Sequence, residues 1–310
     1  MICNLVPAKS SDFAKRMFGV HGEKAGPWLE GLPSLIKKIA KKWKIEIVRP
    51  LDDPSFNYIL EAQRQDGKPV IVKLGVPCKE ILTEIAALQY WDGQGAVRLL
   101  AQAAEDGAFL LERLLPGETL HSVENDEEAT RIACSVMKDL WKPIKQGELF
   151  PTTEDWGRGF ARMRKMFSGG TGPLPQKLTD EAEKTFAQLL VTAKDCVLLH
   201  GDLHHWNILS IGRGRWKAID PKGVIGEPAY EVGAWLRNPL PALLRLDDLD
   251  KVMEKRISIM EESLGISATR IRQWAFSQLL LSAYWCIEDN CDGWENCIPL
   301  AEILLKQLKR

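Results

Sequence analysis

The sequence predicts an α+β fold of two lobes, the first mostly β-strand and the second, larger one mostly helix. Apolar residues recur with a period of two over residues 45–74, whereas helical spacing dominates after about residue 126. The turn-prone stretch Leu114-Leu115-Pro116-Gly117 separates the two patterns. A chain of 310 residues has room for one large or two modest domains.

The chain is predicted to begin with a helical extension over residues 1–43. Residues 27–43 place apolar side chains such as Leu29, Leu32, Ile36 and Ile39 at helical spacing, with lysines on the remaining face. A phosphate-binding or membrane-binding role is the alternative for these lysines. A solvated helix face is the simpler interpretation.

Residues 44–113 are predicted to form a β-sheet with one inserted helix. Alternating apolar residues indicate strands near 45–47, 58–62 and 70–72, and Asp66-Gly67 supplies the turn between the last two. A helix over 78–91 and short strands at 97–100 and 109–111 follow. The third region, residues 114–310, contains the helical patterns, which lie at 126–142, 154–167, 176–194, 247–264, 267–287 and 297–309.

Composition excludes several classes of protein. The formal net charge is −1, so the chain lacks the basic field of a nonspecific nucleic-acid-binding protein. Neither an export leader nor an apolar run of about 18 residues is present, and no membrane partner is expected. The seven scattered cysteines are typical of reduced thiols in the cytoplasm, where we expect the protein to act.

The densest polar cluster is His200-Gly201-Asp202-Leu203-His204-His205-Trp206-Asn207, and Asp220 follows the Asn after thirteen residues. Short apolar strands flank this string, and a Gly212-Arg213-Gly214 turn separates Asn207 from Asp220. Phosphoryl transfer needs this set: one carboxylate for the attacking hydroxyl, and amide and carboxylate oxygens for Mg²⁺. A plain loop of turn-forming residues is the alternative.

The string His-Gly-Asp-Leu-His-x-x-Asn, followed by Ile-Asp-Pro, resembles the aminoglycoside and choline phosphotransferases, which have a protein-kinase-like two-lobe fold. Residues Trp91–Leu100 and Asp220–Glu227 resemble more narrowly the streptomycin 6-phosphotransferases, which are grouped with the hydroxyurea kinases. The resemblance extends from about Phe13 to the last helix. It implies an ATP-dependent, Mg²⁺-dependent small-molecule kinase.

The resemblance assigns roles in the second lobe. Asp202 would accept the proton of the substrate hydroxyl, or orient it, as the catalytic base. Asn207 and Asp220 would hold Mg²⁺ against the β- and γ-phosphates. His204 stands where protein kinases place a phosphate-contacting lysine, and its role stays open.

The resemblance also assigns residues 44–113 to nucleotide binding. Lys73 would contact the α- and β-phosphates, and Glu84 would pair with Lys73, with Glu80 as the rival partner one turn earlier. Ser55 occupies the position of the nucleotide loop, although the glycines of a protein kinase are missing there. The stretch Leu111-Glu112-Arg113-Leu114 would be the hinge, where backbone groups contact adenine.

The acceptor is expected to be a small hydroxylated cation, with streptomycin or a related aminoglycoside as the first choice. An acidic wall could be formed by Glu288, Asp292 and Glu295 beside Tyr284, Trp285 and Trp294, and the fallback candidates are Glu227, Glu231 and the helix over 154–167. A solvated acidic face is the alternative reading of the wall. The segment after Asp220 is too short for a peptide-binding platform.

Other functions remain open at this point. The acceptor could be hydroxyurea or another small metabolite, and the nucleotide could be GTP. From a different class, His200, Asp202, His204 and His205 could belong to a metallohydrolase. A catalytically inactive nucleotide-binding module is a further alternative. The sequence does not decide the oligomeric state.

Overall fold

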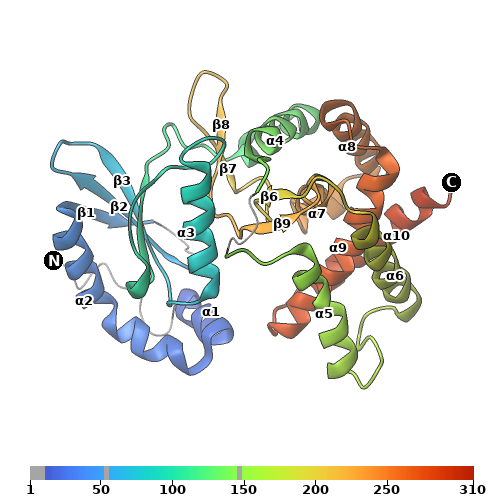
Figure 1. Ribbon diagram of the computed structural model, residues 1–310, viewed down its shortest axis with the longest axis horizontal. Coiled ribbons are helices and arrows are strands. Elements are labelled where there is room, and N and C mark those ends of the chain that lie inside the picture. The colour runs from blue at the N-terminus through green and yellow to red at the C-terminus, as the bar shows by residue number, and fades with distance from the viewer. Residues whose placement is uncertain (1–10, 52–55, 145–148) are drawn as a thin grey trace. The chain divides into compact units, whose positions relative to one another are not determined.

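The computed structural model describes residues 11–51, 56–144 and 149–310 (Figure 1). The chain divides into two compact units, Met1–Leu114 and Leu115–Arg310. An antiparallel sheet dominates the first unit, and helices dominate the second. The predicted α+β fold class is therefore confirmed.

The sheet of the first unit has the strand order β1-β2-β3-β5-β4, and every neighbouring pair is antiparallel. Its strands are β1 (Ile45–Pro50), β2 (Tyr58–Arg64), β3 (Pro69–Leu74), β4 (Leu99–Ala103) and β5 (Ala108–Glu112). Helix α3 (Lys79–Trp91) connects β3 to β4, as the sequence predicted. A turn through Gly67, with φ of 78°, joins β2 to β3.

Two N-terminal helices, α1 (Asp12–His21) and α2 (Ala25–Trp43), cover one face of this sheet (Figure 1). Met17, Leu32 and Ile36 pack in one core cluster with Leu60 and Val72, and all five are at most 1% exposed. Burial of each such side chain contributes about 2 kcal/mol. Because side chains alternate along β3, Lys73 points to the opposite face from Val72.

The second unit is built around α9 (Ala268–Glu288), whose residues from Trp274 to Tyr284 are all buried. The remaining helices are α4 (Asp126–Leu140), α5 (Thr153–Met166), α6 (Gln176–Thr192), α7 (Val232–Arg237), α8 (Leu249–Leu264) and α10 (Cys297–Leu308). Helices α5, α6, α7, α8 and α10 all contact α9. Within the described residues, no helix has both the length and the apolar character to span a bilayer.

Two short antiparallel pairs of strands interrupt the helices. Strand β6 (Val197–Leu199) pairs with β9 (Val224–Gly226), and β7 (Ile208–Ser210) pairs with β8 (Trp216–Ala218). Strands β6 and β7 are the short apolar strands that the sequence predicted on either side of the polar string. Strand β9 was not predicted, because it is recognised only through its pairing with β6, which lies far from it in the sequence. Together the pairs bracket the polar string from His200 to Asn207.

Candidate active site

The polar string forms the loop between β6 and β7, and His200 anchors its start. His200 is fully buried, its Nε2 lies 2.7 Å from the carbonyl oxygen of Ile219, and its Nδ1 accepts the backbone N–H of Asp202 at 3.2 Å. Burial lowers the pKa of His200 to about 4, so the ring is neutral at pH 7. This histidine has the contacts of a structural residue.

Asp202 is partly exposed, and two basic side chains contact its carboxylate. Arg237 Nη2 donates to Oδ1 at 3.2 Å, and His204 Nε2 lies 3.5 Å from Oδ2. Burial acts to raise the pKa of Asp202, but the contact with His204 and the charge of Arg237 outweigh it and hold the pKa below its usual range. The carboxylate is therefore ionised and oriented at neutral pH.

Asn207 and Asp220 come together through the β7–β8 pair. The backbone N–H of Ile219 donates to the carbonyl oxygen of Asn207 at 2.9 Å. Asp220 is the next residue after Ile219, so the pairing brings it close to Asn207. The Asn207 amide nitrogen donates to the Asp202 carbonyl at 3.0 Å, which ties Asn207 to the residue proposed as the base. Asp220 has φ of 62°, a left-handed conformation that aspartate tolerates better than most residues.

The oxygen atoms of Asn207 and Asp220 fit the hard-ligand preference of Mg²⁺. Across the described ranges, no group of three or more His, Cys, Asp or Glu side chains could by itself hold a metal ion. A metal at Asn207 and Asp220 would therefore need ligands from the nucleotide or from water. This arrangement is typical of Mg²⁺ bound with phosphates.

Glu231 and Glu227 are both engaged inside the protein. Glu231 is 1% exposed and accepts the backbone N–H groups of His200 at 2.6 Å and Gly201 at 2.8 Å. Burial raises the pKa of Glu231 to about 7, while these two N–H groups act in the opposite direction. Glu227 accepts hydrogen bonds from Arg270 and from Trp274. Glu231 thus supports the catalytic loop, and Glu227 is tied to α9, whereas the sequence suggested that both contact the acceptor.

Glu288 at the end of α9 is held in a similar way. Arg162 of α5 donates from Nε and Nη2 to the two carboxylate oxygens, at 2.6 and 2.8 Å, and the Tyr284 hydroxyl donates to Oε1. An acceptor cation would have to compete with Arg162 for this carboxylate. Asp292, in the turn after α9, is exposed.

In the first unit, Lys73 of β3 forms an ion pair with Glu84 of α3. Lys73 Nζ lies 2.6 and 2.8 Å from the two carboxylate oxygens, and both side chains are about 5% exposed. The rival Glu80 is exposed. The predicted hinge residue Glu112 accepts the backbone N–H of Arg98 at 2.9 Å.

Two other residues were assigned to nucleotide binding, Leu114 and Ser55. Leu114 ends the first unit and is 9% exposed. Ser55 lies outside the described residues.

A family model described as aminoglycoside/hydroxyurea antibiotic resistance kinase matches residues 43–290. The chain belongs to this kinase family. Its relatives include a streptomycin 6-kinase of Streptomyces glaucescens, 28% identical over 93% of this kinase and 92% of the relative. A hydroxyurea phosphotransferase of Kitasatospora aureofaciens is 29% identical over 97% of this chain and 86% of the relative. A streptomycin 3''-kinase of Klebsiella pneumoniae is 32% identical over 73% of this chain and 83% of the relative.

Solved structures agree with this assignment at the level of the fold. The kinase is similar to choline kinase from Streptococcus pneumoniae, with a TM-score of 0.61 and 17% identity over 90% of this chain and 99% of the other. Choline kinase from Cryptosporidium parvum gives a TM-score of 0.62 at 12% identity, over 89% of this chain and 95% of the other. The predicted protein-kinase-like fold is confirmed, and membership in a kinase family decides against the metallohydrolase.

Arg237 contacts Asp202 from 35 residues away and was not among the predicted site residues. The only sequence signal is a charged residue that ends the apolar run Val232-Gly233-Ala234-Trp235-Leu236. A charge at the end of a short buried helix often has a buried partner. Nothing in the local pattern identifies Asp202 as that partner.

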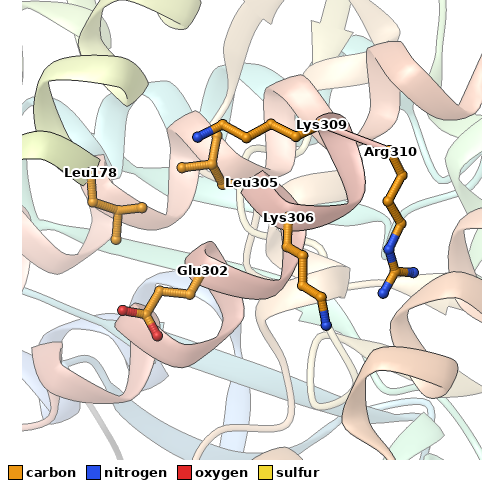
Figure 2. A pocket seen from close by; sticks show the side chains of 6 residues that line it. All are labelled: Leu178, Glu302, Leu305, Lys306, Lys309 and Arg310. Atoms are coloured by element: carbon orange, nitrogen blue, oxygen red, sulfur yellow. The ribbon is translucent and has the colours of Figure 1, made fainter.

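A groove lies between α6 and α10 (Figure 2). It has a volume of about 340 Å³ and is lined by Leu178, Glu302, Leu305, Lys306, Lys309 and Arg310, none of which is a predicted site residue. Lys306 and Arg310 pair with Asp250 across the surface, at 3.7 and 2.9 Å. Much of its positive charge is thus compensated within the protein.

Proposed function

We propose that this kinase transfers the γ-phosphoryl group of ATP to a hydroxyl group of streptomycin or a related aminoglycoside. The observation that carries the proposal is the convergence of Asp202, Asn207 and Asp220 on one loop and hairpin. Relatives named streptomycin 6-kinase align over more than nine-tenths of this chain, which supports the choice of acceptor. Dependence on ATP favours a cytoplasmic setting.

In this proposal Asp202 accepts a hydrogen bond from the acceptor hydroxyl and takes up its proton. The hydroxyl oxygen forms a bond to the γ-phosphorus, and the bond between that phosphorus and the β–γ bridging oxygen breaks, with ADP as the leaving group. Asn207 and Asp220 would hold Mg²⁺, and the ion would neutralise charge on the phosphate oxygens. Arg237 keeps one oxygen of Asp202 fixed, so that the other can meet the hydroxyl.

We further propose that residues 44–113 bind the nucleotide and residues 114–310 supply the catalytic loop, the metal ligands and the acceptor site. Lys73, oriented by Glu84, contacts the α- and β-phosphates. Backbone groups from Glu112 to Leu114 bind the adenine ring, and Ser55 contributes to the phosphate loop. The predicted N-terminal extension precedes these two regions, and its described part forms α1 and α2.

Hydroxyurea is the second candidate acceptor, since the hydroxyurea phosphotransferase aligns with 97% of this chain. The two candidates differ in size: streptomycin carries several rings and cationic groups, whereas hydroxyurea is small and has no ring. A site for streptomycin must therefore have a large volume, whereas a small site is sufficient for hydroxyurea.

Both candidates can be tested in one experiment. Purified protein is incubated with Mg²⁺-ATP and streptomycin, other aminoglycosides or hydroxyurea, and mass spectrometry detects the addition of one phosphoryl group. We expect transfer to streptomycin, and ³¹P–¹H correlation by NMR identifies the modified hydroxyl. The Asp202→Asn variant is the matched control. Phosphorylation of hydroxyurea alone would overturn the aminoglycoside proposal in favour of the second candidate.

A further inference from the structure

Two partly exposed tryptophans, Trp156 of α5 and Trp285 of α9, lie in edge contact. Their ring centroids are 5.5 Å apart, and the planes meet at 85°. Trp156 also contacts Tyr230, whose ring lies 5.2 Å from that of Trp274. Tyr230 and Trp274 are completely buried. Trp156 and Trp285 are therefore the outer members of an aromatic cluster whose inner members form core.

Trp156 reaches the catalytic loop at Gly201, the residue before Asp202. A Cβ atom on Gly201 would lie only 2.6 Å from Cη2 of the Trp156 ring, and Gly201 has φ of 86°. Only glycine combines this conformation with such close approach of the ring. The indole of Trp156 thus forms the surface directly beside the backbone that carries the base.

The two tryptophans sit on helices that are fixed to each other. A Cβ atom on Gly159 would lie 2.6 Å from Leu281 and 3.1 Å from Nε1 of Trp285, so α5 and α9 approach closely. The bidentate pair of Arg162 and Glu288 joins the same helices one turn further on. An aromatic surface held in this way is preorganised for a ligand.

The contacts of Glu288 also determine the chemical character of this surface. Arg162 pairs with its carboxylate, so a cationic ligand would have to displace Arg162 to bind Glu288, whereas the aromatic rings need no such exchange. Indole faces bind cations through their quadrupole and bury the apolar faces of rings. A hydroxylated ring that carries guanidinium or ammonium groups offers both features.

We propose that Trp156 and Trp285 form the subsite that binds the ring and cationic groups of the acceptor beside Asp202. This inference rests on the proposed function and assigns to these two residues the discrimination between a ring-bearing cationic acceptor and a small acyclic one. Trp156 contacts the acceptor next to the reacting hydroxyl, and Trp285 extends the surface away from it.

The test uses the full chain with Trp156→Leu, Trp285→Leu and the milder Trp156→Phe. Steady-state KM values are measured for streptomycin and for ATP, and calorimetry gives the Kd of streptomycin without ATP. We expect each leucine variant to raise the KM and Kd of streptomycin about tenfold, equivalent to about 1.4 kcal/mol, with the KM of ATP within twofold. Trp156→Phe, which keeps an aromatic face, is expected to retain most of the affinity.

Trp43→Leu is the matched control, because Trp43 is a partly buried tryptophan packed against the N-terminal core cluster. It is expected to leave the KM of streptomycin unchanged. Unchanged KM and Kd in Trp156→Leu, with transfer to streptomycin intact, would overturn the subsite alone. Wild-type protein that neither binds nor phosphorylates streptomycin would overturn the proposed function and the subsite with it. If a leucine variant fails to fold, the wild-type protein is used instead, and iodide quenching of its tryptophan fluorescence is measured with and without streptomycin. We expect streptomycin to protect the fluorescence from iodide. A lack of protection would count against the subsite.

Discussion

Arg237 at the end of α7 donates a hydrogen bond to Oδ1 of Asp202 at 3.2 Å, and the side chains are only 16% and 28% exposed. A charge-assisted bond in such a setting is worth about 1.5–3 kcal/mol. It fixes the carboxylate and leaves its second oxygen toward His204. Arg237 is thus a positioning residue for the proposed base.

Arg237→Ala is expected to lower kcat by about 10- to 100-fold, in line with the strength of that hydrogen bond. The KM of ATP should change little. Added guanidinium at millimolar concentration should restore part of the lost kcat, a response that mere structural damage would not give. The exposed Arg245 provides the control Arg245→Ala. Failure of guanidinium to rescue a folded variant would speak against positioning.

Asp202→Asn keeps the shape of the side chain but removes the proton acceptor. We expect kcat to fall by about 10²–10⁴-fold, the usual contribution of a general base. Binding of ADP, measured by calorimetry, should remain close to wild type. A variant that retained more than a tenth of wild-type turnover, with chemistry rate-limiting, would show that Asp202 is not the base.

Asp220→Ala removes one of the two proposed metal ligands. Because oxygen ligands favour Mg²⁺ or Mn²⁺, both ions should support wild-type transfer, and EDTA should abolish it. The variant should show no metal-dependent transfer while keeping its melting temperature within a few degrees. Full activity in Asp220→Ala would contradict the assignment of the metal site.

His200 makes the stability of the protein sensitive to acid. Its pKa is about 4 in the folded state and 6.5 in the unfolded chain, so between these values only the unfolded state binds the proton. The free energy of unfolding should therefore decrease as the pH falls from 6.5 to 4, by about 3 kcal/mol from this residue. Above pH 6.5 the contribution is constant.

Chemical denaturation at pH 7 and pH 4.5 tests this expectation. His200→Asn loses buried hydrogen bonds and should be less stable than wild type at pH 7, but its stability should change less between the two pH values. His121→Gln replaces an exposed histidine and should keep the wild-type difference. An equal pH dependence in His200→Asn and wild type would show that His200 is not the source.

Local patterns were sufficient to predict most of the fold. Alternation along β2 and β3, and the turn at Asp66-Gly67, reflect neighbouring residues, and so does the short string that contains Asp202 and Asn207. The contacts that complete the candidate site join distant parts of the chain. Glu231 binds the loop from 31 residues away, a separation at which hydrophobic periodicity gives no information about the partner.

The partners of the acidic residues could not be predicted from the sequence for the same reason. Glu227 and Glu288 resemble free carboxylates in the sequence, and their partners Arg270 and Arg162 become visible only when α9 is packed against its neighbours. Trp156 offered no local signal of its contact with Gly201, because that contact depends on where α5 docks.

The segment that the family model matches, residues 43–290, is smaller than the unit that must fold. Met17, Leu32 and Ile36 precede it, yet they cover the apolar face of the sheet that holds Leu60 and Val72. Leu300 and Leu304 of α10 follow it and are completely buried. An expression fragment cut at residues 43 and 290 would expose apolar surface at both ends and tend to aggregate. The part of this protein that carries the family signature therefore depends on flanking helices that the signature does not include.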